Sequence, residues 1–135
     1  MAGFFCWQNN VAQISVEAVN DVFQKLQYKQ GKYLSMGEWN VMVFPKYLYD
    51  IDNWIIFSDG AIACCGTFAY KGAMYEQALP ILYQDINSNT LDLSAFWGSF
   101  VIIAYTNNEF SLIRDGAALT RIFTTEQMNI LSTSF

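Results

Sequence analysis

The sequence predicts an α+β fold in which antiparallel strands pack against two helices. Short apolar or alternating runs between turn residues predict the strands. Two stretches with apolar residues at helical spacing predict the helices, and the elements run strand, helix, several strands, helix and strands. No repeat, linker or low-complexity tract divides the chain, so we expect a single domain over residues 1–135.

The first predicted elements are a strand and a helix. Residues 3–7 form an apolar run suited to a strand. Ser15 is suited to cap a helix that extends to about Tyr28, because its hydroxyl can accept a hydrogen bond from the first turn. One face of this helix is apolar at helical spacing, with Val16, Val19, Val22, Phe23 and Leu26.

Three strands are predicted next. A polar connection over residues 29–32 leads to an alternating run, Trp39–Phe44, which reads as a half-buried strand. Residues 47–52 are irregular. The short run 54–57 and the longer run 61–70 then form a hairpin around a tight Ser-Asp-Gly turn.

The second helix is predicted to begin at Gly72 or Ala73. Pro80 lies inside this run, so the helix either starts a new turn there or kinks. Residues 93–97 are predicted to form a single helical turn. The apolar positions of the second helix are Met74, Ala78, Leu82 and Ile86.

The strongest strand signal is the continuous apolar run 98–103, which is typical of a strand buried on both faces. The pair Asn107–Asn108 predicts a hairpin turn into the run 110–113. Two short closing strands are predicted over residues 121–125 and 129–134.

Composition limits the classes of partner. Apolar residues make up 53% of the chain and charged residues only 14%, against about 25% charged residues in a typical soluble domain. We therefore expect some apolar surface to be available to a partner. The net charge of -5, with seven scattered basic residues, argues against nucleic-acid binding, which requires clustered Lys and Arg.

No apolar run reaches the ~18 residues of a membrane span, and the N-terminus does not resemble a signal peptide. We therefore expect a cytoplasmic protein that does not enter a membrane. Cys6, Cys64 and Cys65 have neither disulfide nor metal spacing, and we expect buried thiols. Without histidine or a Gly-rich phosphate loop, we expect no metal, no cofactor and no His-dependent triad.

The stretch from Leu91 to Phe123 resembles part of a known family. It contains Gly-Ser-Phe and, later, Leu-Ile-Arg-Asp. This order is similar to the second half of the glutaminase-type domain that begins the asparagine synthetases, in which a "GxFA" strand precedes a strand ending "ARDxxGxxPLYY". The matching residues are Gly98, Arg114 and Asp115. We expect a structural role for the last two, with Asp115 capping a turn and Arg114 packing its stem.

The N-terminal residues Met-Ala-Gly-Phe-Phe-Cys-Trp resemble the opening of the same family, Met-Cys-Gly-Ile-Phe-Gly-Ile. There the cysteine becomes the first residue and attacks the glutamine amide, with its own amine as the base. The matching position holds Ala2, whose methyl group cannot attack, and Gly3 matches the family glycine. Cys6 is an alternative nucleophile only if five residues are removed.

A third similarity begins at Cys65-Gly66 and resembles the family segment Asn-Gly-Glu-Ile-Tyr-Asn. In that family the Asn side chain and the Gly backbone stabilise the oxyanion. Here Cys65 replaces the Asn, and Thr67 replaces the Glu. The family's Arg-Gly-Pro-Asp segment, whose Arg binds the glutamine carboxylate, has no counterpart between Glu38 and Asp59.

The resemblance implies a truncated Ntn-hydrolase-like αββα sandwich of mostly antiparallel strands with two helices. It also implies a non-catalytic copy of the glutaminase domain, close in size to the domains of β-lactam synthetases and lasso-peptide cyclases that lack the nucleophile. The expected partner is an ATP-dependent amide-forming enzyme, or a peptide. Two alternatives remain open: a residual amidohydrolase that uses Cys6 after processing, and a self-associating structural domain.

Overall fold

The computed structural model describes residues 3–11, 14–45, 53–116 and 122–133. Within these ranges the fold is α+β, with two α-helices and two sheets in which every pairing is antiparallel. By their contacts, residues 1–51 and 121–135 form one compact unit and residues 52–120 form a second. No helix in the described ranges has the length and apolar character needed to cross a membrane.

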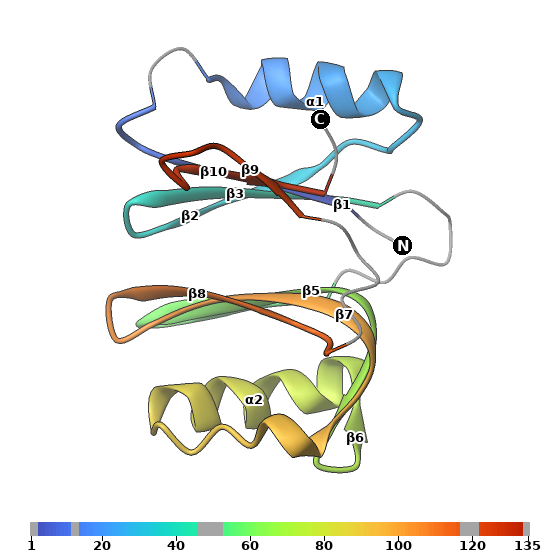
Figure 1. The fold of residues 1–135 in the computed structure, drawn as a ribbon, viewed down its shortest axis with the longest axis vertical. Coiled ribbons are helices and arrows are strands. Elements are labelled where there is room, and N and C mark those ends of the chain that lie inside the picture. Colours follow the sequence, from blue (N-terminus) through green and yellow to red (C-terminus); the bar gives the residue numbers. More distant parts are fainter. Residues whose placement is uncertain (1–2, 12–13, 46–52, 117–121, 134–135) are drawn as a thin grey trace. The chain divides into compact units, whose positions relative to one another are not determined.

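The first unit contains a five-stranded sheet in the order β2-β3-β1-β10-β9. Helix α1 lies along one face of this sheet (Figure 1). Its Phe23 ring stacks on Phe44 of β3 at 4.0 Å between centroids, and the buried cluster also contains Trp7, Val19 and Met42. The elements of this unit are β1 (Gly3–Gln8), α1 (Val16–Lys25), β2 (Lys32–Met36), β3 (Trp39–Phe44), β9 (Phe123–Thr124) and β10 (Ile130–Ser132).

The predicted first helix is confirmed, together with its cap. The Ser15 hydroxyl accepts a hydrogen bond of 3.1 Å from the backbone N–H of Ala18. The helix ends at Lys25, three residues before the predicted Tyr28. Gln27 adopts a φ of 70°, and the Tyr28 N–H bonds to the Phe23 carbonyl, so a Schellman-type cap ends the helix with glutamine in the usual glycine position.

The polar connection predicted over residues 29–32 is too long, and the strand after it was missed. Lys32 begins β2, which pairs along its length with β3. Of its side chains only Met36 is buried, so the pattern lacks the apolar alternation of a half-buried strand. The turn to β3 is set by Gly37, whose φ is 64°.

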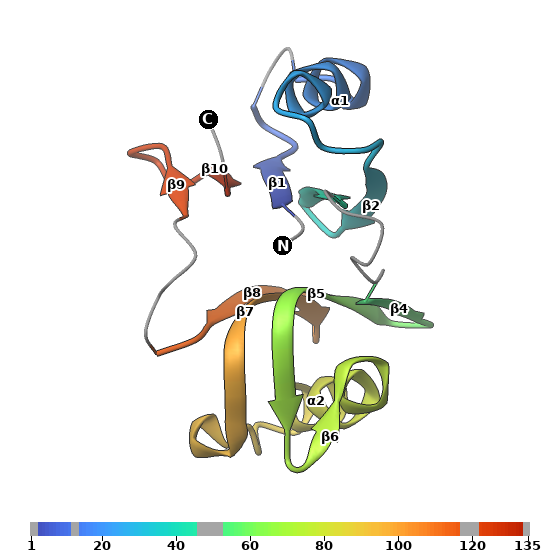
Figure 2. The same ribbon diagram turned by 90° about the vertical axis from the view of Figure 1, so that its right-hand side faces the viewer.

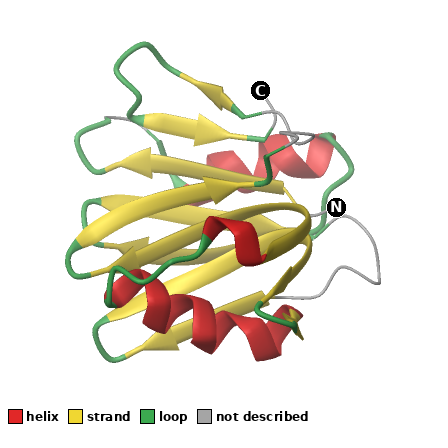
Figure 3. Cartoon of the chain, turned by 60° about the horizontal axis from the view of Figure 1, so that its bottom comes forward, coloured by secondary structure: helices red, strands yellow, loops and turns green. Residues whose placement is uncertain are grey.

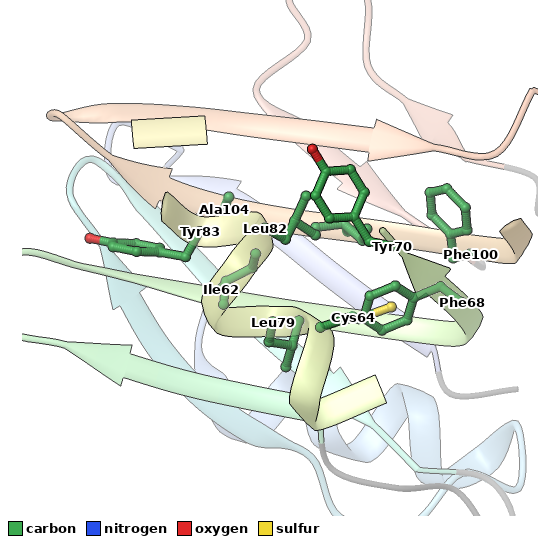
Figure 4. Close-up of a cluster of buried hydrophobic side chains, with 11 residues drawn as sticks. Ile62, Cys64, Phe68, Tyr70, Leu79, Leu82, Tyr83, Phe100 and Ala104 are labelled. Atoms are coloured by element: carbon green, nitrogen blue, oxygen red, sulfur yellow. The ribbon is translucent and has the colours of Figure 1, made fainter. Parts of the chain in front are cut away.

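The second unit contains a sheet in the order β4-β5-β7-β8, with β6 paired to β5. Helix α2 packs on one face of it, and Figure 4 shows the buried side chains between them. Residues 100–104 of β7 are all buried, in agreement with the strand predicted over 98–103. The elements are β4 (Asn53–Phe57), β5 (Gly60–Tyr70), β6 (Ala73–Met74), η1 (Tyr75–Gln77, a 3-10 helix), α2 (Ala78–Asn87), η2 (Leu93–Ala95, also 3-10), β7 (Phe96–Thr106) and β8 (Glu109–Arg114).

The predicted start of the second helix is wrong. Lys71 and Gly72 have φ values of 50° and 81° and form a two-residue turn that pairs Ala73 with Tyr70. The α-helix begins only at Ala78. Pro80 is its third residue, where no intrahelical partner for a backbone N–H is required, so the proline fits the first turn.

The remaining turns and strands agree with the sequence in outline. The 93–97 region begins with the helical turn η2, but its last two residues already belong to β7. Asn107 and Asn108, with φ values of 53° and 60°, join β7 to β8, one of the hairpins visible in Figure 3. The two closing strands are present as the shorter β9 and β10. The irregular segment predicted over 47–52 lies outside the described residues.

Candidate functional site

The fold brings together most of the residues selected from the sequence in the second unit. Cys65 of β5 pairs with Val101 of β7, and Val101 pairs on its other side with Arg114 of β8. In the next row, Gly66 pairs with Phe100, to which Asp115 is hydrogen bonded. The Cys65-Gly66 and Arg114-Asp115 segments therefore lie two strand spacings apart, about 10 Å, on either side of β7.

Two glycines shape the strands at this position. Gly66 and Gly98 have φ values of 108° and 119°, which side-chain-bearing residues rarely adopt. Figure 1 shows β5 and β7 bending together along the end of α2. A Cβ atom on Gly98 would lie 2.1 Å from the Thr67 carbonyl oxygen. Gly98 is therefore required by the backbone conformation and by the close approach of the neighbouring strand.

The sequence predicts that Asp115 caps a turn, whereas the described contact of its side chain is to the neighbouring strand β7. Its side chain is buried, and its Oδ1 accepts a hydrogen bond of 3.2 Å from the Phe100 N–H. Its own N–H donates to the Phe100 carbonyl at the same distance. Arg114 is exposed at the end of β8. The carboxylate thus completes the β7–β8 ladder at the point where β8 ends.

The three cysteines are reduced thiols, and all three side chains are buried, which confirms the sequence expectation of buried thiols. Burial raises the pKa of the Cys64 thiol, and the neighbouring Cys65 adds to that rise. Cys65, in the oxyanion-like segment, is 1% exposed. A nucleophilic or hydrogen-bonding role toward a substrate requires access that these side chains do not have.

The N-terminal candidates belong to the first unit. Ala2, the predicted degenerate nucleophile position, lies outside the described residues. Gly3 begins β1, and a Cβ atom there would lie 2.9 Å from Thr133 Oγ1 and 3.0 Å from the Tyr28 ring. Cys6 is fully buried in the middle of β1, paired with Val41 and Leu131. In the folded chain the Cys6 thiol is therefore inaccessible to solvent.

A polar cluster that sequence reasoning missed lies at the C-terminal end of α2. The Asp85 carboxylate accepts hydrogen bonds from the Tyr70 hydroxyl (2.7 Å) and the Thr90 hydroxyl (2.9 Å), and it pairs with the Lys71 ammonium at 2.7 Å. The Tyr70 hydroxyl also accepts from the Asp92 N–H at 3.0 Å. Tyr70 ends β5, Asp85 lies in α2, and the other members lie in the turn and loop that follow these elements. No sequence signal joins them, because the contacts depend on how β5 and α2 pack.

The electrostatics of this cluster stabilise charged groups. The hydrogen bond from Lys71, with those from Tyr70 and Thr90, lowers the pKa of Asp85 to about 2. The same bond raises the pKa of Lys71, and burial raises the pKa of Tyr70. Each group is held in the protonation state it already has at neutral pH. This arrangement fastens the end of α2 to the β5–β6 turn and is not suited to general acid–base catalysis near pH 7.

A polar hollow of about 300 Å³ lies at the end of the sheet in the first unit, lined by Gln8, Asn9, Asn10 and Glu38. Behind it, the buried Asn40 amide donates to Asn9 Oδ1 at 2.8 Å and accepts from the Tyr33 hydroxyl. The lining residues lie at the end of β1, just after it, and just before β3. Among these four side chains, Asn9 is the one that belongs to the hydrogen-bond network of Asn40.

Among the described residues, no three Cys, Asp or Glu side chains are grouped closely enough to hold a metal ion. Comparison of the chain with models of known protein families, with curated proteins and with solved structures found no match. The functional interpretation therefore depends on the geometry described above and on the resemblance of the motifs.

Proposed function

We propose that the protein is a non-catalytic, glutaminase-like scaffold that associates in the cytosol with an ATP-dependent amide-forming enzyme. One observation carries the proposal. Two motif residues shared with the glutaminase-type domains have structural roles: Asp115 accepts a hydrogen bond from the backbone of β7, and Gly98 permits the close approach of β5 to β7. The positions that would perform the chemistry hold Ala2 and the buried Cys65 instead.

The proposal includes the truncated Ntn-hydrolase-like αββα architecture of that family. Two antiparallel sheets, each with one helix packed on a face, support this part. An experimental structure tests it directly, because in that family the two sheets face each other. Any other arrangement of the two sheets would contradict the assignment of the fold.

The association is tested by affinity purification of the tagged protein from its native host, with quantitative mass spectrometry of the bound proteins. An amide-forming enzyme with a pyrophosphate-binding loop should be enriched. Its absence from the bound fraction, or release of ammonia from glutamine by the purified chain alone, would count against the proposed function.

A further inference from the structure

The polar hollow of the first unit is built on two turns whose backbones are hydrogen bonded to each other. The Asn9 N–H donates to the Glu38 carbonyl at 2.9 Å, and the Val11 N–H closes a turn on the Gln8 carbonyl at 3.0 Å. Figure 2 shows β1 between β10 and β2, with α1 over one face of the sheet, and the hollow lies at the end of β1. Its lining side chains therefore project from a backbone that is already ordered.

The amide orientation of Asn9 follows from its buried neighbour Asn40. The Asn40 Nδ2 donates to the Trp7 carbonyl at 3.3 Å and to Asn9 Oδ1 at 2.8 Å. A carbonyl can only accept, so Asn40 must present its NH2 group on this side, while its oxygen accepts from the Tyr33 hydroxyl. The oxygen of Asn9 therefore faces Asn40, and the NH2 group of Asn9 is presented to the hollow that it lines.

The other lining groups add acceptors to this oriented donor. Glu38 contributes a carboxylate, and Gln8 and Asn10 contribute amides that can both donate and accept. Among the described residues, none of these three side chains has a hydrogen-bond partner. The hollow thus offers a donor, fixed by the Asn40 network, and a charged acceptor, both available to a ligand.

These groups select the chemistry of a ligand. No lysine or arginine lines the hollow, so an anion would meet the Glu38 carboxylate without a compensating cation. A cation would face the N–H donors of Asn9. No apolar side chain lines the hollow, so a hydrocarbon group gains little by entering it. A hydroxyl group, by contrast, can accept from the Asn9 amide and donate to the Glu38 carboxylate at the same time.

We propose that this hollow is a binding site for a neutral monosaccharide, whose adjacent hydroxyl groups each donate and accept. One hydroxyl joins the Asn9 NH2 group to the Glu38 carboxylate, and its neighbours pair with the amides of Gln8 and Asn10. The volume of about 300 Å³ lies at the small end of the range for ligand sites. Preorganisation of Asn9 by Asn40 lowers the cost of binding. The inference goes beyond the proposed scaffold function and does not depend on it.

The test is a titration of the isotope-labelled whole chain, followed by proton–nitrogen correlation NMR spectra that include the side-chain NH2 signals. The probes are the methyl pyranosides of glucose, mannose and galactose, each raised to about 50 mM, because a ligand of this size in an open polar site should have a dissociation constant of about 1 mM. At least one pyranoside should shift the Asn9 and Asn10 NH2 signals saturably. Tetrahydropyran-2-methanol, which has the same ring and a single hydroxyl, and sodium acetate should not.

Asn9→Asp is the sharpest variant, because one carboxylate oxygen still accepts from Asn40 while the donor presented to the hollow becomes an acceptor. It should weaken binding at least about tenfold. Glu38→Gln replaces a charged acceptor with a neutral one and should weaken binding about fivefold. Asn108→Asp is the matched control in the β7–β8 turn. It keeps the side-chain oxygen that accepts from the Tyr105 hydroxyl and should bind as the wild type does. The same spectra show that each variant folds.

Absence of a saturable shift with all three pyranosides would overturn the site. Equal shifts with tetrahydropyran-2-methanol would overturn it too, because adjacent hydroxyl groups would then play no part. Unchanged affinity in Asn9→Asp, or an equal loss in Asn108→Asp, would contradict the role given to the oriented donor and with it the proposal. Stronger shifts with sodium acetate than with the pyranosides would identify an anion site instead.

Discussion

Asp115 and Phe100 are joined by two reciprocal hydrogen bonds, each 3.2 Å long. The Phe100 N–H donates to the Asp115 side chain, and the Asp115 N–H donates to the Phe100 carbonyl. Both residues are buried. The aspartate thus acts as an extension of β8, giving the backbone of β7 a partner one residue beyond the last residue of the strand.

Replacing Asp115 with alanine should lower the free energy of unfolding by about 1–3 kcal/mol, because the buried Phe100 N–H loses its acceptor. Asp115→Asn keeps a side-chain oxygen at the same reach and should lose less than half as much. Urea denaturation followed by circular dichroism measures both variants. Equal destabilisation by Asn and Ala would show that the acceptor oxygen of Asp115 does not account for the loss in the free energy of unfolding.

Gly98→Ala should be among the most destabilising single substitutions in the second unit. The new methyl group would lie 2.1 Å from the Thr67 carbonyl at a φ of 119°, and we expect a loss of roughly 3 kcal/mol or more. Gly72→Ala is the matched control, since its φ is also positive (81°) but no atom lies within 4 Å of the added Cβ. Its cost should be about 1–2 kcal/mol. Thermal or urea unfolding that gave the two variants the same stability would contradict the steric explanation.

The Asp85 carboxylate should contribute to stability above its ordinary pKa of 3.8 and lose that contribution as the pH falls to about 2. Its folded-state pKa is depressed to about 2, chiefly by the hydrogen bond from Lys71, so protonation favours the unfolded chain. Asp85→Asn should flatten the acid limb of the stability curve between pH 4 and pH 2. Asp21→Asn, on the exposed side of α1, is the control and should leave the limb unchanged.

The thiols should be protected from alkylation in the native protein. Cys6, Cys64 and Cys65 are 0%, 3% and 1% exposed, so iodoacetamide should label them only as fast as the chain unfolds. In denaturant all three should react at once. Mass spectrometry identifies the labelled residues and the mature N-terminus together. Rapid labelling of Cys6 in the native state, or a mature chain that begins at Cys6, would instead support the amidohydrolase alternative.

The sequence predicts correctly those elements whose local residue pattern agrees with the packing seen in the structure. The cap at Ser15 and the two-asparagine turn before β8 are examples, because the residue types themselves favour the observed conformations. The edge strand β2 was missed because its formation depends on pairing with β3 and not on burial. The start of α2 was misplaced because Met74 has helical spacing to Ala78, while the positive φ at Lys71 and Gly72 commits the chain to a hairpin.

The candidate site was predictable only in part. The motif at Cys65-Gly66 and the pair Arg114-Asp115 could be selected from the sequence, but their placement on either side of β7 depends on strand register. The Asp85 cluster joins residues 5 to 22 positions apart, from a strand, a helix and the loops that follow them. Single-sequence patterns carry no information on such contacts, since loop and helix residues of the same types are usually solvated.

The position of β1 between β3 and β10 has a consequence for folding during translation. Residues 3–8 are translated well before residues 130–132, which form the neighbouring strand on one side of β1. Residues 52–120, by contrast, make an uninterrupted unit that can condense while synthesis continues. One edge of β1 therefore lacks its backbone hydrogen-bond partner until residues 130–132 have been synthesised.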